Sequence, residues 1–379
     1  MQILFKLPEF REAIKSYKTK NTGQQGERLV MAMQDLFIQI EKEGEAFKPI
    51  KFLQTVFACF PQFAERDQHS MSYQQQDADE CFQLILNQIA PVLDIEINGQ
   101  KKNLITDLFQ ITLKSNFINK EDEAEVSNDI IESVAKVGAI IDNQMNPVSE
   151  LSDGIKIGLE DELEKQSEKH GKNCLFTKKS RMLNLPNYLI VQKIRFVWRA
   201  EDKMTKTEAR KAKILRQVAF PKNLDMYDFC EESLQKEMDP VRTRMLEISE
   251  EEKQRAKDKF EEYKKNNMNK EEDTFKLYKK FKEQENAREV EEHDKNLWGD
   301  LTQGKENGNY ELVGVITHKG RSSDSGHYVS WVQHRGDKWL KFDDDYVTEV
   351  NIDDILFLKG GGDWHMAYYL VYRKLQLRE

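Results

Sequence analysis

"GHYVSWVQHRGDKWLKFDDD", residues 326–345, contains two runs of β-forming residues on either side of a turn that includes Gly336. A tight turn at this glycine pairs residues whose numbers sum to about 671 to 673. His327 then lies within one pair or one diagonal of Asp343 to Asp345, where cross-strand Cβ atoms are about 4.5 to 8 Å apart. The stretch therefore predicts a hairpin in which an imidazole can reach a carboxylate.

A histidine beside an aspartate has two interpretations. In nucleophilic catalysis the carboxylate holds one ring nitrogen, so that the other nitrogen can take a proton from a thiol or hydroxyl. Aspartates at a strand end are also common turn residues, and the spacing alone slightly favours a surface histidine beside an acidic turn. The other histidines compete less well, because they lie in polar stretches or predicted turns, or have no acid at hairpin spacing: His69, His170, His293, His318, His334 and His365.

The composition limits the class of protein. The chain has 379 residues, 33% of them charged, and a net charge of −9, which argues against a nucleic-acid-binding surface and favours a partner with a basic patch. No apolar run of about 18 residues predicts a membrane span, and no signal-type segment is present, so we expect a cytoplasmic or nuclear protein. The four cysteines form no C-x-x-C pair, so we expect no metal, no cofactor and no disulfide framework.

Helical periodicity dominates the first ninety residues. Apolar residues recur at spacings of three and four over 29–40 and 78–89, and Asp77 stands where a carboxylate caps the second helix. Further on, 104–117 predicts a helix end followed by a strand, and 183–198 predicts a central strand. Helices therefore lead and strands follow, which is the order of an α+β fold.

Residues 234–306 differ in kind, because they mix both charge signs densely and offer few apolar residues for a core. We interpret them as a charged helical or disordered insertion; a partner-binding helix is the alternative. After this segment, four short β-rich runs separated by Gly, Ser and Asp predict an antiparallel sheet. Residues 1–233 and 307–379 then form one domain interrupted by the insertion.

Four motifs resemble those of the ubiquitin-specific proteases. "SSDSGHYVSW" (322–331) followed by "KWLKFDDDYVTEV" (338–350) resembles their histidine box, "YQQQDADECFQLIL" (73–86) their Gln-Gln-Asp-Ala helix start, and "LNLPNYLIVQKIRF" (183–196) their Leu-Pro box. The runs "THKGRSSDSGHYVSW" and "LKGGGDWHMAYYLVY" are most similar to the proteasome-associated branch. The resemblance implies a papain-like α+β cysteine protease fold with thumb, palm and fingers.

The resemblance also implies roles for single residues. His327 matches the general base, Asp343 matches the acid that orients it, and Asp344 assists. Asp77 matches an acidic contact to the basic C-terminal tail of ubiquitin and is expected at an exposed helix start. The loop that covers the tail channel is matched by Ser322, Ser323, Ser325 and Gly326, and Tyr328 is a further expected substrate-binding residue.

One departure concerns the nucleophile. The family carries a box similar to Gly-Asn-Thr-Cys-Tyr-Met-Asn at the start of a helix, and the opening "MQILFKLPEFREAIKSY" aligns just after that cysteine. We expect the domain to be truncated at its N-terminus in this sequence, and the chain as written to be inactive. Cys59 and Cys81 are both predicted to be buried core thiols rather than substitutes.

The leading functional hypothesis is a deubiquitinating cysteine hydrolase of the proteasome-associated type, which cleaves the bond after the C-terminal glycine of ubiquitin. Its expected partners are ubiquitin, ubiquitinated proteins and the proteasome regulatory particle, with no nucleic acid and no membrane. Two alternatives stay open at this point. One is a catalytically dead protein that binds ubiquitin or regulates the proteasome; the other is an unrelated scaffold that acts through its charged helices.

Overall fold

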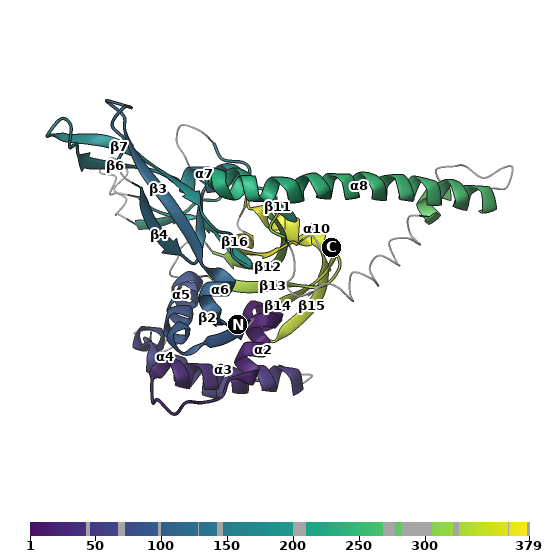
Figure 1. Cartoon of the computed structure of the whole chain (residues 1–379). Helices are drawn as coiled ribbons and strands as arrows, with labels where there is room; N and C mark the ends of the chain where they lie inside the picture. The colour runs from purple at the N-terminus through teal and green to yellow at the C-terminus, as the bar shows by residue number, and fades with distance from the viewer. Residues whose placement is uncertain are drawn as a thin grey trace.

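The computed structural model describes residues 1–42, 46–66, 73–97, 100–127, 129–141, 147–199, 210–267, 277–281, 305–320, 326–362 and 364–376. An N-terminal group of helices packs against a large central sheet, a narrow four-stranded sheet projects on one side, and one long helix extends on the other (Figure 1). The N-terminal helices, the central sheet and the narrow four-stranded sheet are, in that order, the thumb, palm and fingers that the resemblance implied. The fold is therefore α+β and papain-like.

The N-terminal helices form where the periodicity predicted them. The predicted helices over 29–40 and 78–89 are confirmed, and helix α4 ends two residues before Pro61. Asp77 caps α5, because its Oδ1 accepts from the backbone N–H of Asp79 at 2.7 Å and of Glu80 at 3.4 Å. The helices are α1 (Gln2–Lys6), α2 (Pro8–Ser16), α3 (Gln25–Lys42), α4 (Ile50–Cys59), α5 (Ala78–Ile89) and α6 (Leu104–Phe109).

The central sheet has the strand order β15-β14-β13-β12-β16-β8-β5, with β11 paired to β12. All its pairs are antiparallel except β5 with β8. The predicted central strand is β8, and the predicted C-terminal antiparallel sheet is confirmed. The strands are β5 (Val137–Ile140), β8 (Tyr188–Ile194), β11 (Asn223–Asp225), β12 (Asn309–Lys319), β13 (His327–Arg335), β14 (Lys338–Asp343), β15 (Tyr346–Asn351) and β16 (Met366–Lys374).

The sheet separates two hydrophobic cores. Side chains of a strand alternate between faces, so Tyr188 and Ile190 of β8 enter the core under α1–α6, whereas Leu189 and Val191 enter the opposite core. The second core also contains residues of α7 (Leu151–Gly158) and α10 (Ile352–Leu356). Burying each side chain of this size contributes about 1.5 to 3 kcal/mol, so both faces hold the palm rigid.

The fingers are a separate antiparallel sheet with the order β4-β3-β7-β6. The predicted helix end and strand over 104–117 correspond to α6 and β3, and β3 alternates strictly between buried and half-buried residues. The strands are β3 (Ile111–Asn119), β4 (Ile130–Val134), β6 (Glu160–Gln166) and β7 (Asn173–Met182). Two further antiparallel strand pairs complete the described strands: β1 (Asp94–Ile97) with β2 (Gln100–Asn103), and β9 (Phe196–Arg199) with β10 (Arg210–Lys213).

The long helix α8 (Glu232–Asn267) begins the segment that we interpret as an insertion. It extends away from the body (Figure 1), and the part of the charged segment that it covers is helical. A short helical piece, 277–281, packs on its far end, where the ring of Phe281 lies 5.4 Å from those of both Phe260 and Tyr263. The rest of 234–306, namely 268–276 and 282–304, lies outside the described residues, and the domain boundaries stay a prediction.

A buried guanidinium joins segments of the palm that come from different parts of the sequence. Arg195, only 1% exposed, follows β8 and donates hydrogen bonds to four backbone carbonyls. These are the carbonyls of Ala367 (2.9 Å), Ile214 (3.2 Å), Arg216 (3.1 Å) and Lys359 (2.9 Å). Burial lowers the pKa of Arg195 to about 10, so the group stays charged at neutral pH. Arg195 therefore fixes three segments that are far apart in the sequence.

A buried carboxylate orders the loop between α2 and α3. Glu27 is 3% exposed and accepts hydrogen bonds from the hydroxyl of Thr19 (2.6 Å), the hydroxyl and amide of Thr22 (both 2.7 Å) and the amide of Asn21 (3.0 Å). These donors, the Thr19 hydroxyl first, lower the pKa of Glu27 to about 2. The ionised carboxylate of Glu27 therefore keeps the loop between α2 and α3 ordered.

We predict that Glu27→Gln lowers the melting temperature at pH 7 by roughly 3 °C or more, because an amide accepts fewer of these bonds. Since the folded pKa lies below the unfolded value, the stabilisation is full above about pH 4.5 and disappears as the pH falls towards about 2. Thermal melts between pH 2 and 7 test this, with Glu164→Gln on exposed β6 as the control. Equal melting temperatures of the two variants at pH 7 would contradict it.

Candidate active site

The hairpin of β13 and β14 has the predicted register. Opposed residues carry numbers that sum to 672, as in the pair Trp331 and Lys341, and the register shifts by one only next to the turn, between Gln333 and Arg335. Continued to the open end, this register places Asp343 diagonally across from His327 on the same face. The structure thus brings the two predicted residues together.

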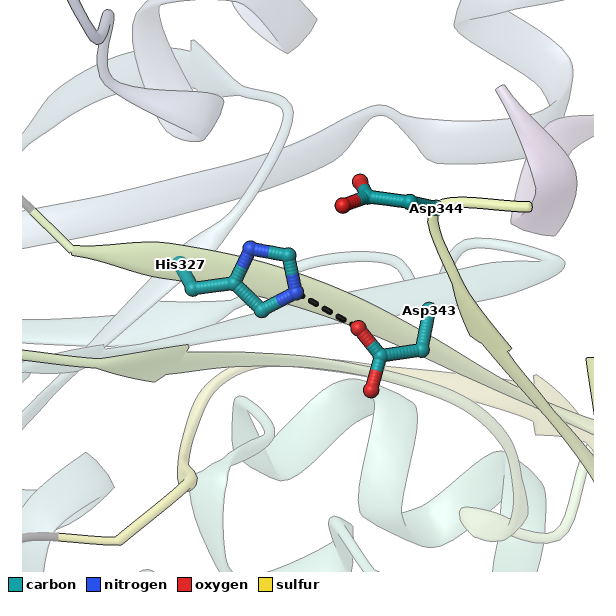
Figure 2. Close-up of side chains that lie close together, drawn as sticks. All are labelled: His327, Asp343 and Asp344. Carbon is teal, nitrogen blue, oxygen red and sulfur yellow. Dashed lines mark hydrogen bonds and ion pairs between the residues drawn. The ribbon is translucent and has the colours of Figure 1, made fainter. Parts of the chain in front are cut away.

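His327 and Asp343 are in direct contact. The Nε2 of His327 lies 2.6 Å from Oδ1 of Asp343 (Figure 2), and the two side chains are 38% and 28% exposed. Because a carboxylate only accepts, we assign the proton to Nε2, which leaves Nδ1 unprotonated. Nδ1 has no hydrogen-bond partner in the described part of the chain. This is the geometry of a base whose tautomer is fixed by an acid.

The acid of the pair is itself held by a lysine. The Nζ of Lys341 lies 2.6 Å from Oδ2 of Asp343, the oxygen that does not face the histidine. The hydrogen bond from Lys341, followed by that from His327, lowers the pKa of Asp343 to about 2. The carboxylate is therefore ionised at neutral pH.

The second aspartate lies in the turn that follows β14. Asp343 pairs with Tyr346, so Asp344 and Asp345 form the connection, and Asp344 has a φ of 53°. One ligand atom each of His327, Asp343 and Asp344 lies within 4.8 Å of the others, as a metal site would require. The ammonium of Lys341 already compensates Asp343, and a second cation would be repelled there. The arrangement suits proton transfer better than metal binding.

Asp77 lies beside two tyrosines. The hydroxyl of Tyr368 lies 3.1 Å from each carboxylate oxygen of Asp77, and the Tyr368 ring is 6.3 Å from that of Tyr328. Asp77 is half-buried by these rings rather than exposed, which corrects the expectation from its place at a helix start. No lysine or arginine among the described residues forms an ion pair with it. Its charge is therefore free to receive a cationic group.

Gly326 is tightly enclosed at the start of β13. Its φ is +150°, and a Cβ at this position would lie 2.3 Å from the backbone oxygen of Lys319 and 2.5 Å from Nε2 of His318. Only glycine fits here, so this residue decides where His327 begins its strand. The other residues predicted for the loop, Ser322, Ser323 and Ser325, lie outside the described residues.

Two neighbours of the pair were not predicted. His365 is 7% exposed, its ring lies 6.0 Å from that of His327, and its Nδ1 is 3.3 Å from Oγ1 of Thr317. Lys341 could have been found from the sequence, since it stands two residues before Asp343 on one strand face. His318 and His334, expected in turns, instead lie within β12 and β13; His318 pairs with Tyr328, and His334 lies at the register shift between Gln333 and Arg335.

None of the described side chains brings a thiol to Nδ1 of His327. Cys59 and Cys81 are half-buried rather than fully buried as expected, and burial raises the pKa of both thiols. Cys174 and Cys230 are buried, and burial raises the pKa of Cys230 to about 12. A thiol whose pKa is raised is a poor nucleophile at neutral pH.

Comparison with known proteins decides the family. The profile described as ubiquitin carboxyl-terminal hydrolase matches residues 1–372. The chain belongs to this family. It is 33% identical over 388 residues to ubiquitin carboxyl-terminal hydrolase 7 of Arabidopsis thaliana. The alignment covers 98% of this chain and 74% of that protein.

Two further relatives of this ubiquitin carboxyl-terminal hydrolase come from other organisms. Ubiquitin carboxyl-terminal hydrolase 6 of Schizosaccharomyces pombe is 30% identical over 390 residues, covering 98% of this chain and 74% of that protein. Ubiquitin carboxyl-terminal hydrolase 14 of Caenorhabditis elegans is 32% identical over 355 residues, covering 93% and 64%. Among the described residues, no helix is long and apolar enough to span a bilayer.

We predict that Gly326→Ala displaces His327 and destabilises the fold by about 1 to 3 kcal/mol, because a side chain there is strained and collides with backbone. Urea unfolding measures the loss of stability, and the imidazole N–H proton resonance reports whether the bond to Asp343 survives. Gly362→Ala is the control, since no atom lies within 4 Å of its Cβ position. A Gly326→Ala variant as stable as this control would refute the steric argument.

Proposed function

We propose that this ubiquitin carboxyl-terminal hydrolase chain supplies the general base and the orienting acid of a thiol-dependent deubiquitinase. His327 is the base and Asp343 the acid. The observation that carries the proposal is the 2.6 Å contact between Nε2 of His327 and Oδ1 of Asp343, which leaves Nδ1 available. The half-exposed imidazole can still be reached by a substrate.

In the proposed reaction, Nδ1 of His327 takes the proton of a cysteine thiol. The thiolate attacks the carbonyl carbon of the last glycine of ubiquitin, and the imidazolium returns its proton to the leaving amine as the peptide or isopeptide bond breaks. Water then hydrolyses the acyl-enzyme with the same imidazole as base. Asp343 stays ionised throughout and holds the ring in place.

Asp77 is the proposed contact to the basic tail of ubiquitin. Its carboxylate is ordered by the cap of α5 and by Tyr368 and has no ion-pair partner among the described residues, which favours capture of an arginine. Gly326, Tyr328 and the serines Ser322, Ser323 and Ser325 form the proposed cover of the tail. The motif resemblance further supports a proteasome-associated enzyme that acts in the cytoplasm or nucleus with the regulatory particle as partner.

The nucleophile in this proposal is none of the four cysteines of the sequence. Support comes from the raised thiol pKa of Cys59, Cys81 and Cys230 and from the lack of a described thiol partner for Nδ1 of His327. The lack of a described thiol partner for His327 also favours a second candidate function, a ubiquitin-binding protein that has lost its catalytic activity. The compact His327 and Asp343 pair argues against that candidate, because binding alone does not require it.

We predict that the purified chain binds mono-ubiquitin and that Asp77→Ala weakens this binding by about 1 to 3 kcal/mol, or roughly 5- to 150-fold in Kd. Asp77→Asn keeps an acceptor for the helix cap but removes the charge, so it should lose nearly as much affinity while α5 stays intact. Calorimetric titration measures both, with Asp153→Asn, at an exposed position of α7, as the control. Unchanged affinity of Asp77→Asn would remove this residue from the site, and no binding by the unmutated chain would reject the proposed substrate.

We predict that the chain as written forms no covalent adduct with ubiquitin carrying a C-terminal electrophile, because no cysteine is activated by His327. Mass spectrometry after overnight incubation gives the result. An adduct at Cys81 or Cys59 would show that one of them is the nucleophile. Binding of ubiquitin without an adduct agrees with the proposal.

A further inference from the structure

We propose that Lys341 is a positioning residue of the His327 and Asp343 pair, which both aims the carboxylate and sets the pH range in which the imidazole is a neutral base. The inference rests on the proposed function, since it concerns how the same pair is tuned. Lys341 comes from the middle of β14, and nothing in the motif pattern marks it as more than a strand residue.

Lys341 contacts only one of the two carboxylate oxygens of Asp343. Lys341 and Asp343 are two residues apart on β14, so they share a face, and the ammonium lies 2.6 Å from Oδ2. The other oxygen, Oδ1, is 2.6 Å from Nε2 of His327. A carboxylate held at both oxygens cannot rotate, and Oδ1 therefore stays in line with the imidazole.

The ammonium is itself restrained by the neighbouring strand. Trp331 lies directly opposite Lys341, and Nζ is 5.5 Å from the centroid of its ring, a cation–π distance. Trp331 is 7% exposed, and its Nε1 donates to Oγ1 of Thr317 at 2.9 Å. Thr317 in turn contacts His365, whose ring packs edge to face against that of His327. The contacts of Lys341, Trp331, Thr317 and His365 thus run continuously from Asp343 back to His327.

Lys341 is the cation that contacts the pair directly. Burial, then the nearby charge of Lys341, lowers the pKa of His365 to about 4, so His365 is neutral at pH 7. His318 is also neutral there, because burial and Lys213 lower its pKa to about 4. Among the described residues, the titratable and charged groups near His327 are Asp343, Lys341 and Asp344 of the β14 segment, His318 and Lys319 of β12, and His365 before β16.

The expected effect has a definite sign. A carboxylate stabilises the charged imidazolium, and a lysine on the carboxylate weakens that stabilisation. Removing the charge of Lys341 therefore keeps His327 protonated to a higher pH and leaves less neutral base. Because Lys341 is 26% exposed, solvent screens part of the effect, and we expect an upward shift of roughly 0.5 pH unit. Well below the midpoint this is about a threefold loss of neutral imidazole.

The test compares Lys341→Met, which removes the charge, with Lys341→Arg, which keeps it. Nitrogen-detected NMR of histidine-labelled chain, recorded from pH 5 to 8.5, follows the His327 ring, which is assigned by its loss in His327→Gln. Lys338→Met is the matched control, because Lys338 lies on the same strand but pairs with Glu349 at 3.2 Å. The measurement needs no nucleophile and no substrate.

The proposal expects the midpoint of His327 to rise in Lys341→Met and to return in Lys341→Arg, with Lys338→Met unchanged. It also expects the Nε2-protonated tautomer to become less populated in Lys341→Met. A midpoint in Lys341→Met within 0.1 unit of the unmutated chain overturns it, and so does an equal shift in Lys341→Arg. Failure of ubiquitin binding with the shift intact would reject the proposed function and leave this coupling standing.

Discussion

The register of one antiparallel pair, β13 with β14, determines the site. A slip of one residue would move every side chain of one strand to the other face, so the same sequence would then separate His327 from Asp343. Trp339 on β14 is 0% exposed, and Trp331 on β13, which pairs with Lys341, is 7% exposed, so a slip would bring large apolar surface into water. The hydrophobic core thus fixes the register that brings His327 and Asp343 together.

Much of this geometry could be read from the sequence because it is local. A hairpin is defined by its turn, and counting outward from Gly336 was enough to place His327 near Asp343. The cap of α5 by Asp77 and the helix faces over 29–40 and 78–89 also depend on nearest neighbours alone. The large antiparallel sheet followed from alternation and turn residues.

What the sequence did not reveal depends on contacts between distant segments. His365 reaches the site because β16 pairs with β12, and no hairpin rule connects those strands. The contact of Tyr368 with Asp77 joins residues 291 positions apart, and it is this ring that makes Asp77 half-buried. The thiols of Cys59 and Cys81 lie at the margin of a core whose shape is set by six helices, so their burial was overestimated.

Arg195 has a consequence for how the molecule reaches its native state. Its bonds to Ala367 and Lys359 span 172 and 164 positions, so loops of that length must close before the guanidinium gains acceptors. A cation stripped of water before its carbonyls arrive is costly, and desolvation should therefore coincide with the docking of the C-terminal strand. We expect slow, cooperative folding in which the docking of β16 is the last step.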